Sequence, residues 1–181
     1  MGLPIQSDRA PISLYFNITD HCNSLCSFCA AGIPALKNPG MIPPTRVLQI
    51  YETYNLGPGD DVVINGGEPT VYRHLELVVR EAAIRGAKVI LFTNGRLLCH
   101  NDRARAWLKA GVYRVSIPIH GSRASTHDVL TQRPGSFAQT IAGIRNALAL
   151  QAEIGFPEEI ELKVLAVRDS LVEWPEIIDL I

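Results

Sequence analysis

The chain has 181 residues, with 17 Lys and Arg against 18 Asp and Glu, and 47% of its residues are hydrophobic. This balance predicts one globular domain over residues 1–181, without the basic excess typical of nucleic-acid binding. No apolar run approaches the roughly 18 residues that a membrane helix needs. The start of the chain also lacks the charged-then-apolar order of a secretory signal. The sequence therefore predicts a cytoplasmic protein with neither a membrane nor a nucleic acid as partner.

Hydrophobic spacing predicts strands that alternate with helices along the chain. Residues 12–19 alternate with a period of two, which is typical of a half-buried strand. We expect further strands at 61–65, 88–93, 113–119 and 159–167. Apolar residues at helical spacing predict helices around 47–54, 75–83, 101–110, 137–148 and 174–181. We expect the segment 120–136 to be a long connection.

This alternation, at about 25-residue spacing, predicts an α/β fold with a parallel sheet and right-handed crossovers. Periodicity alone does not choose between an open sheet and a barrel. The last expected helix is not followed by the strand that should come next. This pattern indicates a truncated chain, a partial gene product, or a barrel that another element completes.

Three of the four cysteines fall within eight residues and form a C-x3-C-x2-C loop from Cys22 through Cys26 to Cys29. Thiolates bind soft metals and iron–sulfur clusters. Three ligands on a [4Fe–4S] cluster leave one iron open, as a catalytic metal keeps a position free. The alternative is a structural zinc site with His21 or a distant side chain as fourth ligand. Structural zinc sites usually have a second closely spaced ligand pair of the C-x2-C kind, which the sequence lacks. The separate Cys99 is expected to be a small buried residue.

The cysteine motif, with the aromatic Phe28 before its last cysteine, and a Gly-Gly-Glu-Pro motif at residues 66–69 together resemble the radical S-adenosylmethionine (SAM) superfamily. The two motifs lie in order about 40 residues apart, and the likeness covers roughly residues 12–181. It is closest to the molybdenum-cofactor biosynthesis and SPASM-type peptide-maturase branches. It implies a partial (βα)6, TIM-like barrel that ends after about the fifth βα unit. The sixth strand and any C-terminal domain would be missing.

The resemblance also implies the chemistry. The cysteines would hold a [4Fe–4S] cluster, and SAM would chelate the open iron. An electron from a donor such as flavodoxin or ferredoxin would cleave SAM to methionine and a 5′-deoxyadenosyl radical. The radical would abstract hydrogen from an unknown substrate, a small molecule or a peptide. The alternative function is a non-catalytic zinc or iron–sulfur module that holds a partner.

Several residues inherit SAM-contacting roles from this resemblance. Gly66 and Gly67 would let the backbone approach the methionyl group of SAM. Glu68 would accept a hydrogen bond from the SAM ammonium group. Pro69 would shape the turn, and Phe28 would flank the cluster loop at the SAM site.

Other candidates follow the later strands, where barrel enzymes gather their sites. Thr93 would face SAM, and Ser116 would contact SAM or simply pack in the barrel. His120 stands in a stretch where many relatives read Ser-x-Asp, and it would exchange protons near substrate or cap its loop. Lys163 would face substrate, the SAM carboxylate or solvent. The remaining candidates would meet an anionic substrate or the SAM carboxylate, or be exposed loop charges: Arg123, His127 and Arg133.

Overall fold

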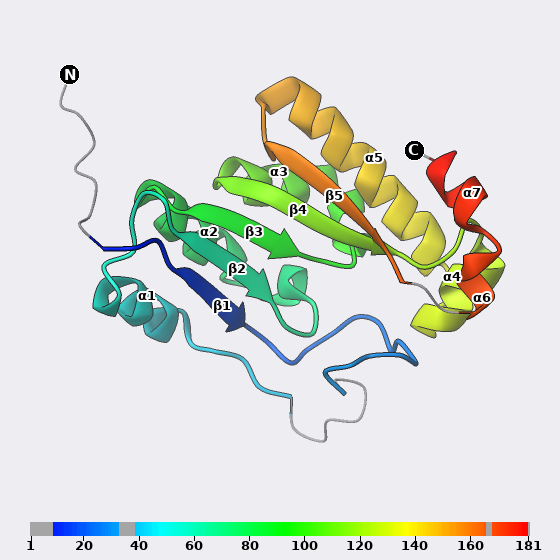
Figure 1. Ribbon diagram of the computed structural model, residues 1–181, viewed down its shortest axis with the longest axis horizontal. Coiled ribbons are helices and arrows are strands. Elements are labelled where there is room, and N and C mark those ends of the chain that lie inside the picture. Colours follow the sequence, from blue (N-terminus) through cyan, green and yellow to red (C-terminus); the bar gives the residue numbers. More distant parts are fainter. Residues whose placement is uncertain (1–8, 33–38, 166–167, 181) are drawn as a thin grey trace.

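The computed structural model describes residues 9–32, 39–165 and 168–180. Its framework is a parallel five-stranded sheet in the order β1-β2-β3-β4-β5 (Figure 1). The strands are β1 (Ser13–Asn17), β2 (Asp61–Asn65), β3 (Lys88–Phe92), β4 (Val112–Ile119) and β5 (Glu159–Val164). Each strand pairs with the next in sequence. This winding is that of a partial barrel, so the predicted fold class is confirmed.

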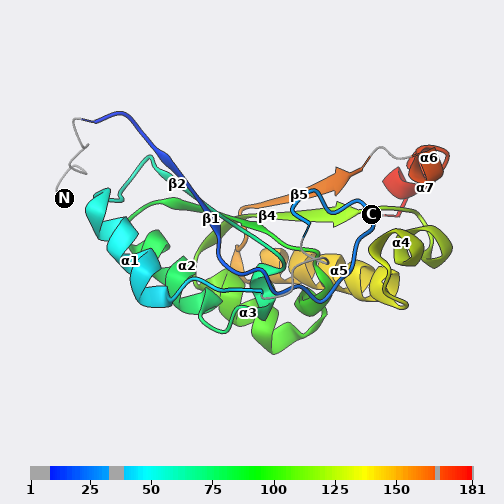
Figure 2. The same cartoon turned by 90° about the horizontal axis from the view of Figure 1, so that it is seen from below.

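Four helices cover one face of the sheet, as Figure 2 shows from the side. They are α1 (Pro44–Thr53), α2 (Leu75–Ile84), α3 (Asn101–Lys109) and α5 (Ser136–Ile154). Three shorter helices, α4 (Ala124–Thr131), α6 (Arg168–Leu171) and α7 (Trp174–Ile178), lie together near the carboxyl end of β4 (Figure 1). The 3-10 turns η2 (Pro69–Val71) and η3 (Arg96–Cys99) follow β2 and β3. No helix in the described ranges is long and apolar enough to cross a bilayer.

The hydrophobic core lies between the sheet and these helices. Alternate strand residues such as Ile64, Leu91 and Ile117 are fully buried in it, because successive strand side chains point to opposite faces. The intervening residues, among them Phe92 and Ser116, line a pocket on the other side of the sheet. The period-two pattern therefore separates a packing face from a face that is free to bind a ligand.

Some expectations about individual segments were wrong. The expected connection 120–136 contains helix α4. Leu148 closes the apolar stripe expected for the helix around 137–148, but in α5 it is 38% exposed, and the smaller Ala147 is buried instead. Cys99 is half-buried, not buried, at the end of η3. The strand β5 ends at Val164, and part of its expected continuation, residues 166–167, lies outside the described residues.

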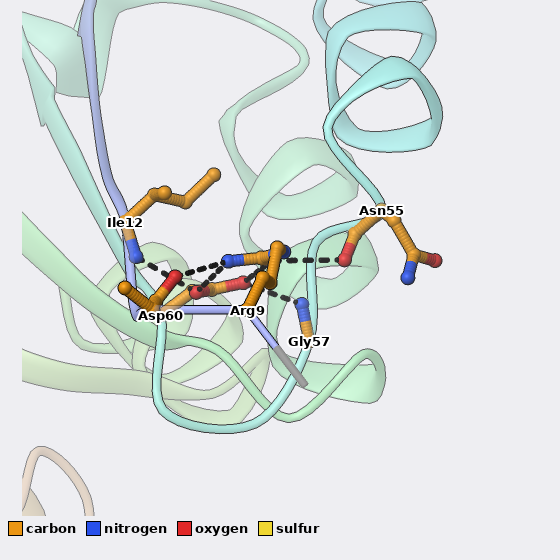
Figure 3. Close-up of polar contacts among 6 residues, drawn as sticks. Arg9, Ile12, Asn55, Gly57 and Asp60 are labelled. Carbon is orange, nitrogen blue, oxygen red and sulfur yellow. Dashed lines mark hydrogen bonds and ion pairs between the residues drawn. The ribbon is translucent and has the colours of Figure 1, made fainter. Parts of the chain in front are cut away.

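A polar cluster fixes the amino ends of the first strands (Figure 3). The carboxylate of Asp60, just before β2, accepts hydrogen bonds from the Arg9 guanidinium, from Ile12 N at 3.0 Å and from Gly57 N at 2.9 Å. Arg9 also donates to the backbone oxygen of Asn55 at 3.0 Å. Hydrogen bonding to Arg9 and to these amides lowers the pKa of Asp60 to about 2. This cluster joins the start of β1 to β2 at the end opposite the pocket.

Candidate functional site

A pocket of about 320 Å³ opens at the carboxyl ends of the strands. It brings together side chains from the cysteine loop, from all later strand ends and from α4. The predicted residues that line it are Cys22, Cys26, Phe28, Cys29, Gly66, Gly67, Glu68, Thr93, Ser116, His120, His127 and Lys163. Pro69 is buried behind the lining, at the start of η2. The predicted candidates therefore converge on one place, as parallel strands ending at one rim should bring them.

The cysteine loop is attached to the carboxyl end of α4. Leu25 N donates to the backbone oxygen of Thr131 at 3.0 Å, and Ser27 N donates to that of Leu130 at 3.1 Å. Within the loop, Cys29 N donates to the oxygen of Cys26 at 3.2 Å. The helix that the sequence analysis missed is thus the support of the cysteine motif.

The three thiols of this loop are half-buried and free. Burial raises the pKa of Cys22, and burial together with the charges of Cys22 and Cys29 raises that of Cys26 to about 11. No group of three or more His, Cys, Asp or Glu side chains in the described ranges is arranged to hold one metal ion. An iron–sulfur cluster distributes its thiolates over separate irons, so its ligands need not converge on one point. Any metal that binds here must displace the thiol protons.

Gly66 and Gly67 lie where the chain after β2 crosses the chain after β1. A Cβ on Gly66, whose φ is +139°, would meet the Thr19 oxygen at 2.4 Å, and one on Gly67 would meet the His21 oxygen at 2.3 Å. Gly67 N donates to that Thr19 oxygen at 2.6 Å. The glycine pair therefore has a structural reason within the chain itself, apart from any ligand: it lets the cysteine loop lie against the β2 end.

The carboxylate of Glu68 is fully buried and bonded by its own chain. Its Oε1 accepts from Thr70 N at 3.0 Å, from Thr70 Oγ1 at 2.6 Å and from Thr93 Oγ1 at 2.6 Å. Its Oε2 accepts from Asn94 N at 2.7 Å. Burial raises the pKa of Glu68, and these hydrogen bonds oppose that change. Each carboxylate oxygen has about two acceptor positions. Oε2 accepts only the Asn94 bond, so it keeps room for one more donor from the pocket.

The chain after β3 connects this carboxylate to the cysteine loop. Asn94 Nδ2 donates to Asn23 Oδ1 at 2.6 Å, between Cys22 and Cys26 in sequence. Arg96 donates to the Asn23 oxygen and to Ser24 Oγ at 3.2 Å. No role was predicted from the sequence for Asn23, Asn94 or Arg96. Only their position in the sequence could have pointed to them: Asn23 is a polar residue within the cysteine motif, and Asn94 and Arg96 follow the end of a predicted strand.

Two buried polar atoms of the pocket have no partner within the described residues. Ser116 is fully buried and its Oγ is unpaired, while His120 is 6% exposed and its Nδ1 is unpaired. Leaving such atoms without a hydrogen bond costs about 1–3 kcal/mol each. Because both atoms line the pocket, a polar ligand or water there would satisfy them.

His120 is packed between aromatic rings at the pocket wall. Its ring centroid lies 4.6 Å from that of Phe28 and 5.4 Å from that of His127. Its backbone N–H donates to His127 Nδ1 at 3.2 Å, so His127 carries its proton on Nε2 when neutral. Burial lowers the pKa of both rings to about 4. Both imidazoles are therefore uncharged at neutral pH.

The remaining predicted cations have different places. Lys163 lies at the pocket rim, with Nζ 4.1 Å from the Phe92 ring centroid and 3.4 Å from Glu161 Oε2. Its side chain is 45% exposed, so it faces both the pocket and solvent. Arg123 forms an ion pair with Glu173 at 3.1 Å outside the pocket lining. Arg133 also lies outside this lining, and its buried Nε has no hydrogen-bond partner in the part of the chain that the structure describes.

Comparison with known proteins gives the same identification as the motifs. The Radical SAM superfamily matches residues 16–159, from β1 to the start of β5. The chain belongs to this superfamily. The matched range contains both sequence motifs and every strand that contributes a residue to the pocket except most of β5.

Individual relatives refine this placement. The chain is 27% identical over 165 residues to the AdoMet-dependent heme synthase of Oleidesulfovibrio alaskensis, covering 91% of this chain and 41% of that protein. It is 30% identical over 178 residues to the GTP 3',8-cyclase of Mycolicibacterium smegmatis, covering 96% and 46%. The chain therefore spans less than half the length of these curated relatives.

Solved structures support the same fold. The structure of SuiB from Streptococcus suis bound to S-adenosylmethionine matches with a TM-score of 0.69 at 19% identity, over 94% of this chain and 37% of SuiB. At this identity the likeness shows a shared fold. The predicted resemblance to the radical SAM superfamily is confirmed.

Proposed function

We propose that this chain binds a [4Fe–4S] cluster and SAM in its pocket and forms the radical-generating core of an enzyme. The observation that carries the proposal is the meeting of two motifs. Cys22, Cys26 and Cys29 share one pocket with Gly67 and Glu68. A structural metal module would need the thiols but has no use for a ligand pocket beside them.

The cluster would be held by the three cysteines, which leave one iron for SAM. When bound, the reduced cluster would supply the electron that breaks the S–C5′ bond of SAM, giving methionine and a 5′-deoxyadenosyl radical for hydrogen abstraction. The electron would come from a donor protein such as flavodoxin or ferredoxin. The chain's own contribution is to hold the reactants and to exclude water.

The SAM ammonium would be placed by the free acceptor position of Glu68 Oε2, because a buried carboxylate forms a strong bond to a cationic donor. Thr93 and Pro69 would support this placement indirectly. Thr93 donates to Glu68, and Pro69 begins the turn that brings Thr70 to the same carboxylate. Ser116 Oγ would take a SAM hydrogen bond, which satisfies its unpaired state.

On the other wall, Phe28 and His120 would shape the space beside the cluster. The neutral His120 ring offers one unpaired nitrogen to a substrate or SAM hydroxyl. His120 is therefore our candidate for a residue that binds or exchanges a proton with the substrate. The substrate itself, small molecule or peptide, and the cytoplasmic location stay predictions.

The test is SAM binding by the cluster-loaded protein. Glu68→Gln keeps the shape of the side chain but removes its charge, so we expect SAM affinity to fall at least tenfold while iron and sulfide content stay at the wild-type level. Glu153→Gln, a carboxylate exposed on α5, is the matched control. Unchanged SAM affinity in Glu68→Gln would contradict its role. Protein that retains zinc and no iron would support the non-catalytic metal module instead.

A further inference from the structure

The side chain of Arg96 is a cation inserted between the cysteine loop and the helical layer. Arg96 begins η3, separated from the end of β3 by three residues, and lines the pocket together with the three cysteines. Its guanidinium bonds to two consecutive residues that lie between the first two cysteines, Asn23 and Ser24. Its Nε donates to Gln139 Oε1 on α5 at 2.7 Å. These contacts fix the guanidinium on the pocket side of the loop.

All of the hydrogen bonds that Arg96 makes within the described residues go to neutral acceptors: a backbone oxygen, a hydroxyl and an amide. Other arginines of the chain are neutralised by carboxylates, as Arg105 is by Glu153 and Arg114 by Glu159. Arg96 thus forms no ion pair within the described residues, and the Glu68 carboxylate, which lines the same pocket, is bonded by Thr70, Thr93 and Asn94 instead. A half-buried charge of this kind acts over longer distances than an exposed one, because solvent screens it less.

Arg96 lines the same pocket as Cys22, Cys26 and Cys29. Its positive charge would stabilise any additional negative charge placed on a group that these sulfurs hold. Reduction of an iron–sulfur cluster by one electron is such a change, and local charge is one of the factors that set cluster potentials.

Resting on the proposed function, we propose that Arg96 is a positioning residue whose fixed charge raises the reduction potential of the cluster bound at Cys22, Cys26 and Cys29. It would make the cluster easier to reduce for an electron donor. Its hydrogen bonds to Asn23 and Ser24 hold the charge beside the loop, and the bond to Gln139 ties that arrangement to α5.

The test is a redox titration of the SAM-free, cluster-loaded protein followed by EPR. Arg96→Gln should lower the equilibrium constant for one-electron reduction at least tenfold, which corresponds to about 59 mV. Arg96→Lys keeps the charge and loses the forked hydrogen bonds, so it should stay near the wild-type potential. Arg103→Gln is the matched control, because it removes one exposed arginine charge on α3 and should leave the potential unchanged.

Each outcome decides the proposal. Equal potentials in wild type, Arg96→Lys and Arg96→Gln, at equal iron content, would overturn it while leaving the cluster assignment intact. Loss of the cluster from both Arg96 variants, or a potential that falls equally in both, would also overturn it, since the role would then be only to anchor the loop. A wild-type chain that takes up no cluster would instead overturn the proposed function on which this inference rests.

Discussion

The carboxylate of Glu68, after β2, accepts a hydrogen bond from the backbone nitrogen of Asn94, after β3, at 2.7 Å. The side chain of Asn94 in turn donates to Asn23 in the cysteine loop. One short chain of hydrogen bonds therefore connects the Gly-Gly-Glu-Pro motif to the cysteine motif. The two motifs behave as one structural unit, although they are separate in sequence.

Substitution of Asn94 tests this connection. Asn94→Ala removes the bond to Asn23 and the one that Arg96 N donates to Asn94 Oδ1 at 3.1 Å. We expect the free energy of unfolding to fall by about 1–2 kcal/mol, and iron retention after desalting to fall several-fold. Asn101→Ala, which removes an exposed bond to Asn146, should change neither quantity appreciably. Full iron retention in Asn94→Ala would show that the loop does not depend on this link.

The close crossing at Gly67 gives a second prediction. In Gly67→Ala the new methyl group would meet the His21 backbone oxygen, so the cysteine loop must move. We expect a loss of about 1–3 kcal/mol in the free energy of unfolding, measured by urea denaturation, together with weaker cluster binding. Gly57→Ala is the control, because its methyl group would have only ordinary contacts at 3.8 Å or more. Equal stabilities of the two variants would refute the steric argument.

The His120–His127 pair predicts a pH dependence of stability. Burial lowers the pKa of each ring from 6.5 to about 4, so the unfolded chain takes up protons first as the pH falls. Stability should therefore be highest above pH 6.5 and decrease toward pH 4, by up to about 3 kcal/mol per ring. His127→Asn keeps an acceptor for His120 N but does not titrate. We would measure the free energy of unfolding by urea at about pH 4.5, just inside this window, and at about pH 7.5, above it. In His127→Asn this free energy should change with pH about half as steeply as in the wild type. An unchanged slope would contradict the assignment.

The Arg9–Asp60 cluster should contribute to stability and not to ligand binding. Asp60→Asn replaces an acceptor with a donor group facing the backbone amides of Ile12 and Gly57. We expect the free energy of unfolding, measured in urea, to fall by about 1–3 kcal/mol. SAM affinity should not change, because the Arg9–Asp60 contacts lie at the end of the strands opposite the pocket. The neighbouring Asp61→Asn is the control for the change in charge. A weaker SAM affinity in Asp60→Asn, measured where it is fully folded, would contradict this separation.

Much of the fold could be predicted from the sequence because the strands carry strong patterns. Strand β2 ends at Asn65 as expected, because its apolar residues stand between acidic residues on one side and the Gly66-Gly67 pair on the other. Helix α4 was missed because its turns contain few apolar residues. Its buried side chains are His127, Leu130 and Thr131, which give no clear helical stripe.

The site was predictable as a set of positions but not as a network. Strand ends placed Thr93, Ser116 and His120 at one rim, and the pocket contains all three. The roles of Asn94 and Arg96 depend on contacts with the cysteine loop, a segment about 70 residues earlier in the chain. Local patterns carry no information about such contacts, because they arise only when the sheet brings the strand ends together.

The central claim is that one pocket holds a cluster and SAM together. The most direct measurement is EPR of the anaerobically reconstituted, dithionite-reduced protein, with and without SAM. We predict a [4Fe–4S]+ signal that changes when SAM is added, because SAM would occupy the iron that the three cysteines leave open. A cluster signal that ignores SAM, or a colourless protein that retains zinc, would contradict the account.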